Sequence, residues 1–367
     1  MQLKRKSTIA DVARNAGLSQ AAVSRWLNGK LSLPPASADR IRLAVIQLDY
    51  QPNAQARRLS RGRADTIGII VPDISNPFFA LIASEAEQTV AEFGYDLVIW
   101  SSRNQPDKEL TCFERLSTGL VDGLLLITNH ADDGRLAAAI NKHPRRAVLI
   151  DEDVPGALAP RFFVENEQGG YAATRQLLEF GHRFILHIGG PKDVMSATER
   201  AAGWRRALSE AGIKPKDDWR ICTEYEVAPA FEAARDIFVR KDRPSAVFAG
   251  SDAIALGVMM QARAYGVAIP ADLSLIGFDG MPIVDLLGPP LTSVAQPIDE
   301  LGRGGALALV GLLNGTTTNF ETHRLPVSLV SRSSAAAPRP ALHAASKDHI
   351  KQGAGNPPGV QNIGSVT

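Results

Sequence analysis

Two short stretches near the start of the chain carry apolar residues at helical spacing. The first places its apolar side chains on one helix face, at Ile9, Val12, Ala13 and Ala16. The second runs through Val23, Trp26 and Leu27 and ends at Asn28-Gly29, a helix stop. Gly17 lies between them and can take a positive φ. The pattern therefore predicts two short helices joined by a tight turn.

The residues that flank these stretches favour the same helices. Thr8 and Asp11 have the spacing of a capping box, and Ser19 can cap the second helix. A third helix is expected from Pro35 to Leu48, with Pro35 at its first position and an inward face of Ile41, Val45 and Leu48. Together they predict a helix-turn-helix, whose second helix can enter the major groove of DNA.

The rest of the chain alternates short apolar runs with amphipathic helical stretches, which is typical of parallel α/β units. About 270 residues are too many for one compact sheet, so two lobes facing each other across a cleft are expected. The predicted strands are Thr66–Val71, Tyr95–Trp100, Gly123–Ile127, Ala147–Ile150, Phe184–Ile188, Ala246–Ala249 and Leu273–Phe278.

Charge separates the two parts of the chain. Residues 1–63 hold twelve lysines and arginines against three acidic residues, a net charge of +9, and the rest of the 367 residues carry a net charge of −8. A cationic module on a mildly acidic body is typical of a nucleic-acid binder with a second function. Two cysteines exclude a disulfide scaffold, and the absence of a long apolar run makes a membrane span or secretory signal unexpected. A cytoplasmic protein is the expectation.

The exposed face of the second predicted helix holds the candidates for reading bases. Gln20 can bond adenine, Arg25 can bond guanine and the small Ala21 can touch a thymine methyl group. Ser24 and Thr8 are expected to bond phosphates. A solvated charge is the structural alternative for Arg25.

A short basic segment follows, in which Asn53 can cap a helix of about seven residues that is too short to be stable alone. We expect this hinge to form when docked on DNA beside its twin. Leu59 at its end has no obvious core to enter. An apolar wedge beside arginines suits insertion into the minor groove, where it bends the duplex.

Polar side chains follow nearly every predicted strand, among them Asp73, Thr128, Asp151, Asp252 and Asp279. In parallel sheets these strand ends form the ligand crevice. Phe78 and Phe79 beside Asp73, the planar fork of Arg200 and the carboxylate of Asp279 suit a polyhydroxylated ring. The structural alternatives are two core phenylalanines, a turn cap at Asp279 and an ion pair of Arg200 with Glu199.

These residues resemble LacI/GalR-family transcriptional regulators. The resemblance rests on Thr8–Ala13, Ala16–Ser19, Val23–Arg25, Leu27–Gly29 and Tyr50–Asn53 with Ala56, Arg57 and Leu59, and in the body on Val71–Phe79, Val121–Gly123, Gly181-His182, Arg200, Gly203-Trp204, Ile276–Asp279 and Leu291–Val294. It departs at Leu33-Pro34-Pro35, where the family usually has a Val-Ser cap before the third helix. It spans roughly residues 7–334.

The resemblance implies a helix-turn-helix domain over 1–51, a hinge over 52–63, a two-lobed periplasmic-binding-protein-like body over 64–334 for effector binding and dimerisation, and a tail over 335–367 that composition predicts to be disordered. DNA contacts are implied at Thr8, Ser19, Gln20, Ala21, Ser24, Arg25, Asn28, Asn53, Ala56, Arg57 and Leu59. Effector contacts are implied at Asp73, Phe78, Phe79, Ser196, Arg200, Tyr225, Asp252 and Asp279.

A homodimer on near-palindromic operator DNA follows from the resemblance, with tetramers left open. Purine-binding relatives carry an arginine where this chain has Val194, so a sugar or sugar derivative is the expected effector, and a nucleoside is the alternative. Inducer and corepressor both remain open. Effector is expected to move the lobes, change the separation of the hinges and so alter the Leu59 wedge.

Two other classes of protein fit the sequence less well, an enzyme and an architectural DNA-binding protein. The chain has no Walker loop, no Gly-x-Ser-x-Gly elbow, no His-Glu-x-x-His, no Gly-x-Gly-x-x-Gly and no histidines at metal spacing, so neither an enzyme, a cofactor nor a metal is expected. His182 and His187 are expected to be structural. An architectural protein that only bends DNA does not need so large a body.

Overall fold

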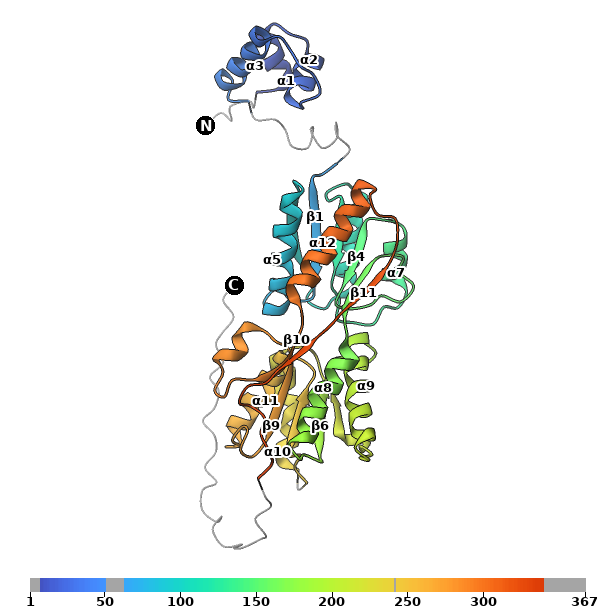
Figure 1. The fold of residues 1–367 in the computed structure, drawn as a ribbon. Helices are drawn as coiled ribbons and strands as arrows, with labels where there is room; N and C mark the ends of the chain where they lie inside the picture. Colours follow the sequence, from blue (N-terminus) through green and yellow to red (C-terminus); the bar gives the residue numbers. More distant parts are fainter. Residues whose placement is uncertain (1–6, 51–62, 241, 340–367) are drawn as a thin grey trace, which may run out of the picture.

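The computed structural model describes residues 7–50, 63–240 and 242–339. The head (residues 7–50) contains α1 (Ile9–Ala16), α2 (Gln20–Leu27) and α3 (Pro35–Gln47) (Figure 1). Its core is formed by Val12, Ala13, Ala16, Val23, Ile41 and Ala44, all buried. Val45 and Leu48, expected to face inward, are half-buried and pack against this core.

Local hydrogen bonds explain where the head's helices begin and end. The Thr8 side chain accepts the Asp11 amide at 3.3 Å while Asp11 accepts the Thr8 amide at 2.9 Å, which confirms the capping box. Gly17 ends α1 in the left-handed conformation, with φ of 65°. Pro35 is the first residue of α3, as predicted, and Pro34 before it supplies no side-chain cap.

The first lobe is a six-stranded sheet in the order β11-β5-β4-β3-β1-β2, all its pairs parallel. The strands are β1 (Thr66–Val71), β2 (Asp96–Ser101), β3 (Gly123–Leu126), β4 (Ala147–Ile150), β5 (Arg161–Val164) and β11 (Thr322–Leu325). The helices are α5 (Pro77–Glu92), α6 (Pro106–Ser117), α7 (Arg135–Asn141) and α12 (Ile298–Asn314).

The second lobe repeats this plan in the order β12-β10-β9-β8-β6-β7, with only β12 antiparallel. Its strands are β6 (Ile185–Gly189), β7 (Arg220–Cys222), β8 (Ala246–Ala249), β9 (Ser274–Asp279), β10 (Thr292–Ala295) and β12 (Ser328–Val330). Its helices are α8 (Asn166–Glu179), α9 (Met195–Glu210), α10 (Val227–Val239) and α11 (Asp252–Ala264), with 3₁₀ turns η1 (Asp217–Trp219) and η2 (Pro282–Leu286).

The chain crosses between the lobes at three places: between β5 and α8, between β10 and α12, and between β11 and β12. The last crossing is the red segment that runs from one lobe to the other in Figure 1. The expected two-lobed α/β architecture is therefore confirmed, and each lobe is assembled from segments distant in sequence.

Each of the seven predicted runs contains a strand, with ends that shift by at most one residue. The strands that were not predicted are β5, β7, β10, β11 and β12. Three of these lie at sheet edges, namely β7, β11 and β12, and their side chains are exposed or half-buried. Edge strands of three or four residues carry no buried apolar run, so the signal used for prediction is absent there.

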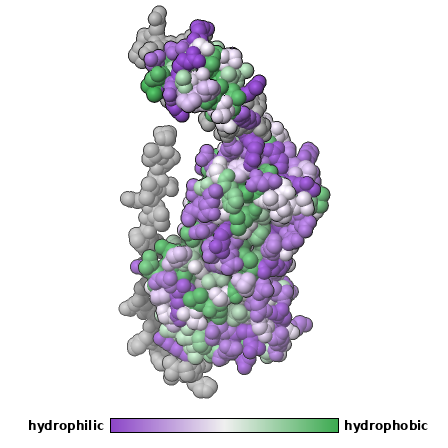
Figure 2. Space-filling view, turned by 45° about the horizontal axis from the view of Figure 1, so that its top comes forward, coloured by the Kyte–Doolittle hydropathy of each residue, from purple (hydrophilic) through white to green (hydrophobic). Residues whose placement is uncertain are grey.

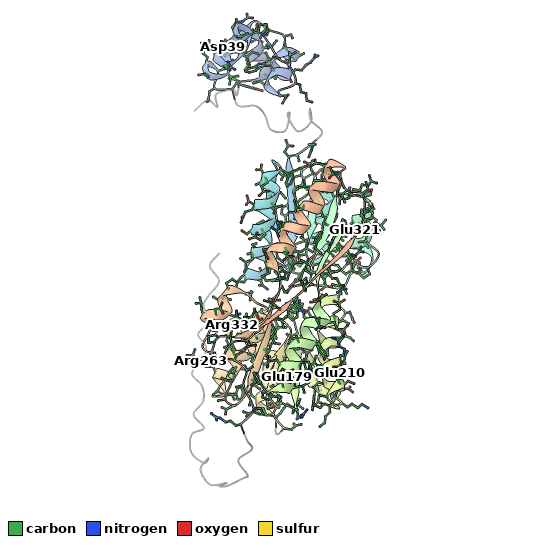
Figure 3. All side chains as sticks on the ribbon, viewed as in Figure 1. Asp39, Glu179, Glu210, Arg263, Glu321 and Arg332 are labelled. Carbon is green, nitrogen blue, oxygen red and sulfur yellow. The ribbon has the colours of Figure 1, made fainter. Side chains whose placement is uncertain are left out.

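Residues 331–339 pack on the second lobe rather than starting a free tail. Arg332, labelled in Figure 3, pairs with Asp285, and Arg339 pairs with Asp272 at 2.9 Å. Ala336 bonds Ser274 through its amide and its carbonyl group. The body therefore extends beyond the expected boundary at residue 334, and residues from 340 onward lie outside the described part.

Candidate functional site

The outer face of α2 presents the predicted base-reading residues together. Gln20, Ala21 and Arg25 are exposed, whereas Val23 is fully buried against α1 and α3. Ser24 is half-buried. Because residues one turn apart share a helix face, these side chains form one solvent-facing surface on the second helix of the motif.

The other predicted DNA contacts in the head already have internal hydrogen bonds. The Ser19 side chain accepts the Ala22 amide at 3.2 Å, and the Thr8 hydroxyl donates to Asp11 at 2.7 Å. The Asn28 side-chain amide donates to the Ser24 carbonyl at 2.9 Å. These bonds fix the helix ends. Contacts of Thr8, Ser19 and Asn28 with DNA stay predictions. The hinge residues Asn53, Ala56, Arg57 and Leu59 lie outside the described residues.

A second group of polar side chains meets at the boundary between the two lobes. We call it the interlobe cluster, and it comprises Asp151, Glu152, Ser196, Arg200, Tyr225, Asp279 and Gln296. The first two follow β4 in the first lobe, and the other five belong to the second lobe. Each is at most 8% exposed.

Arg200 is the buried cation of this cluster. Its guanidinium donates to Asn166 Oδ1 at 2.8 Å and to the Gly250 carbonyl at 2.6 Å, and it lies 3.8 Å from Asp279 Oδ1. The guanidinium also covers the ring of Phe278, 3.8 Å from its centroid. Burial lowers the pKa of Arg200, but the surrounding Tyr225, Asp279, Asp151 and Glu152 outweigh it and raise the pKa overall. Arg200 therefore faces Asp279 inside the protein and does not form the ion pair with Glu199, which pairs with Arg324 instead.

Asp279 ends β9 with a positive φ of 118°. Its Oδ1 atom accepts a hydrogen bond from Gln296 at 2.8 Å. Burial raises the pKa of Asp279 well above its usual value, although Arg200 opposes this. The carboxylate thus needs positive or hydrogen-bonding partners.

Asp252 lies directly behind Asp279 and is fully buried. Both of its oxygens have protein partners, the Ser293 hydroxyl at 2.6 Å and the Met281 amide at 2.9 Å. Burial raises its pKa to about 6. These bonds hold the turn after β9, so the structure gives Asp252 a supporting position rather than the open one expected of an effector contact.

Asp151 belongs to the cluster, although the sequence marks it only as a polar residue that follows a strand. It has a positive φ of 69°, is 5% exposed, and its Oδ1 atom is buried without a hydrogen-bond partner. Burial raises its pKa, and Arg200 opposes the rise. The Oε1 atom of Gln296 is likewise buried and unpartnered. The cluster therefore presents two open acceptors.

Glu152 joins the two lobes directly. Its two carboxylate oxygens accept the backbone amides of Met195 at 2.7 Å and Ser196 at 3.1 Å, at the start of α9. Helix α9 has no side-chain cap from its own segment, so a carboxylate of the first lobe fills that role. Burial, and then the neighbouring Asp151, raise the pKa of Glu152 to about 7. This contact holds the end of β4 in the first lobe against the start of α9 in the second.

Ser196 and Tyr225 lie together, with their hydroxyl oxygens 3.0 Å apart. A Cβ atom at Gly190 would lie 2.1 Å from the Tyr225 ring, so only glycine allows the ring to lie there. Burial raises the pKa of Tyr225, which keeps its phenol neutral. The family resemblance implies effector contacts at both residues. The Tyr225 ring lies 5.6 Å from the Arg200 guanidinium, and Ser196 lies beside Tyr225.

The remaining predicted effector residues have different surroundings. Asp73 is half-buried, and its two oxygens accept the Ser75 amide at 2.9 Å and the Ser75 hydroxyl at 2.6 Å, so its carboxylate closes its own turn. Phe78 and Phe79 pack edge to face, with ring centroids 5.3 Å apart, and each is 3% exposed. Both have the burial of core residues, and their contact with an effector stays a prediction.

Two histidines expected to be structural have partners consistent with that role. His187 is fully buried, bonds the Phe248 carbonyl at 3.0 Å and stacks on its ring, and burial lowers its pKa to about 3. His182 bonds Ser245 and the Ala336 carbonyl, both at 2.8 Å. Within residues 7–50, 63–240 and 242–339, no group of three or more His, Cys, Asp or Glu side chains is arranged to hold a metal ion. None of the helices in these ranges is both long and apolar enough to cross a membrane.

Comparison with known families gives two matches that agree with this architecture. Residues 8–53 match the family described as bacterial regulatory proteins, lacI family. Residues 174–335 match the periplasmic binding protein-like domain. The first match covers the described head and the second lies mostly in the second lobe.

Full-length relatives share both parts. Catabolite control protein A of Priestia megaterium is 30% identical over 328 residues, which cover 89% of this chain and 98% of that protein. The structure of the regulator CelR in complex with cellobiose is similar over 90% of this chain and all of that chain, with 30% identity and a TM-score of 0.69. The lac repressor dimer, bound to operator and the anti-inducer ONPF, is similar over 91% of this chain and all of that chain, with 25% identity and a TM-score of 0.79. The chain belongs to the LacI family of bacterial regulatory proteins, and it is a transcriptional repressor rather than an enzyme.

Proposed function

We propose that this repressor controls carbohydrate uptake or catabolism genes, and that a sugar or sugar derivative bound at the interlobe cluster sets its affinity for operator DNA. The observation that carries the proposal is the cluster itself. It combines a buried guanidinium, carboxylates and open acceptors contributed by both lobes. Hydroxyl groups of a sugar satisfy such acceptors, and an occupant held by both lobes favours one lobe arrangement.

The chemistry of the head supports sequence reading by α2. Arg25 offers two parallel donors for guanine, Gln20 pairs a donor with an acceptor for adenine, and Ala21 offers a small apolar surface for thymine. Thr8, Ser19, Ser24 and Asn28 surround this face and position it through phosphates. We propose that the hinge, with Asn53, Ala56, Arg57 and Leu59, contacts the minor groove.

A homodimer supplies two such heads to a near-palindromic site. Hydrophilic residues cover most of the body surface seen in Figure 2, with apolar residues gathered in patches. Large apolar side chains exposed on the body include Val98 and Ile99 on β2, Met260 on α11, and Ile283 and Leu286 on η2. Leu286 is 81% exposed, and we assign these residues to the dimer interface.

The test begins with DNA selected by the full-length chain from a random duplex pool. Its affinity is then measured with and without each member of a panel of sugars and nucleosides. A palindromic consensus and a sugar that changes the affinity support the proposal. A response only to nucleosides overturns the sugar assignment, and selected DNA with no response to any ligand favours an architectural role.

A further inference from the structure

The interlobe cluster contains more acidic than basic groups. Asp151, Glu152 and Asp279 surround the single guanidinium of Arg200, and all four residues are at most 5% exposed. Arg332 influences Asp252 behind the cluster and pairs with Asp285. A buried carboxylate without a cation or a set of donors is costly, so the imbalance calls for a partner.

The protein satisfies two of these three carboxylates. Glu152 accepts two backbone amides of α9, and Asp279 accepts the Gln296 side-chain amide and faces Arg200. Asp151 differs from both. Its Oδ1 atom has no hydrogen-bond partner although the residue is 95% buried. The least satisfied negative charge of the cluster is therefore Asp151.

Gln296 provides the second open group of the cluster, which is a hydrogen-bond acceptor like that of Asp151. Gln296 donates its amide to Asp279, which leaves its Oε1 atom as a buried acceptor without a partner. A molecule that fits both Asp151 and Gln296 must supply donors at both places. A carboxylate or phosphate supplies no donor at either place.

We infer that the effector is a polyhydroxylated molecule carrying a protonated amine, which binds against Asp151 while hydroxyl groups donate to Gln296 and Asp279. This inference rests on the proposed function. An ammonium group offers three donors and a positive charge, and its hydrogen bonds to a carboxylate are charge-assisted. A neutral hydroxyl fills the donor position but leaves the excess negative charge buried.

Matched sugars separate charge from shape. Calorimetric titration of the full-length protein compares glucosamine with glucose, N-acetylglucosamine and glucuronate, and the galactose and mannose series in the same way. In at least one series the amine is expected to bind at least about tenfold more tightly than the neutral members, which corresponds to about 1.4 kcal/mol. The uronates are expected not to bind.

Asp151→Asn tests the position of the amine. The variant keeps the shape of the side chain and removes its charge, so the ratio of the amine's affinity to that of the neutral sugars should fall to less than about threefold. Asp153→Asn is the matched control, since Asp153 lies two residues away and pairs with Arg161 at 2.9 Å. This control should keep the full preference.

The inference is overturned if neutral sugars or uronates bind as tightly as the amine in every series, if no series binds, or if Asp151→Asn keeps the preference. The titrations on the unaltered chain decide the matter even if a variant fails to fold. Selection of DNA by the same protein preparation separates failure of the amine inference from failure of the proposed function. Specific DNA binding without an amine preference removes only this inference, whereas no preference for any duplex removes the proposed function.

Discussion

The head and the interlobe cluster differ in how far their polar side chains are exposed to solvent. The head has a small core and keeps Gln20 and Arg25, the residues proposed to read bases, exposed on its surface. The cluster buries its charges, and Arg200, Asp151 and Asp279 depend on one another inside the body. Changes in the head should therefore alter binding with little effect on folding, whereas changes in the cluster should alter both.

The largest effect on folding is expected from Arg200→Ala. Removing the guanidinium leaves Asp279 and Asp151 buried beside no cation, and a broken buried pair costs about 3–5 kcal/mol. Urea unfolding of the full chain measures the loss. Arg206→Ala is the control, because Arg206 pairs with Glu167 at the surface and should cost less than about 1 kcal/mol. Equal losses of unfolding free energy in the two variants would contradict the claim that charges in the cluster matter more for stability than charges at the surface.

Glu152→Gln tests the contact between the lobes through pH. The pKa of Glu152 is raised from 4.5 to about 7, so the folded chain holds this proton more tightly than the unfolded chain. Between these values the wild type should lose stability as the pH rises. The variant cannot ionise, so it should lose this share of the slope. Its Nε2 group cannot accept one of the two α9 amides, so the lost hydrogen bond should also lower stability by about 1–3 kcal/mol at every pH.

Unfolding curves across this pH range check the prediction. Asp252, whose pKa is raised to about 6, contributes a slope of the same sign in both proteins. The difference between the two proteins therefore isolates Glu152. An identical slope in wild type and variant contradicts the role of this carboxylate.

Arg25→Ala should weaken binding and leave folding unchanged. Loss of a bidentate guanine contact costs about 1–3 kcal/mol and relaxes selection at one or two base pairs. Competition binding with single-base variants of the selected DNA measures both effects. Arg14→Ala is the matched control, because Arg14 is exposed on α1 and pairs with Asp11 at 3.2 Å. Uniform weakening at all positions would reassign Arg25 to a phosphate.

The smallest effect is expected from Thr8→Ala, which removes the capping box of α1. Such a change costs about 1 kcal/mol. Hydrogen exchange of the full chain should show faster exchange for amides in α1, with those of the body unchanged. Faster exchange in both parts would show that the head and the body unfold together.

Much of the fold could be predicted because its signals are local. The capping box at Thr8, the turn at Gly17 and the start of α3 at Pro35 are each set by residues within one helical turn. The seven predicted strands follow from apolar runs, and six of them are buried, whereas the edge strand β2 is exposed or half-buried. The short edge strands β7, β11 and β12 have no such run, and their pairing is set by distant partners.

The cluster was predictable only in part. Arg200 and Asp279 were named from their chemistry, and Ser196 and Tyr225 through the resemblance, and all four lie in the cluster. The open acceptors of Asp151 and Gln296 depend on how the two lobes pack. Glu152 bonds the amides of residues 43 and 44 positions further along the chain. Local pattern cannot give such distances. Asp252 was named through the resemblance, and the bonds that it accepts from Ser293 and Met281 could not be read from its neighbours in sequence.

The central claim is that occupancy of the buried cluster changes how tightly the exposed head binds DNA. The most direct measurement is the dissociation constant of the full-length chain for its selected duplex, with and without a saturating concentration of the tightest-binding sugar. The account predicts a change of at least about fivefold, and the same factor when sugar affinity is measured with and without duplex. Two identical DNA dissociation constants at saturation would contradict it.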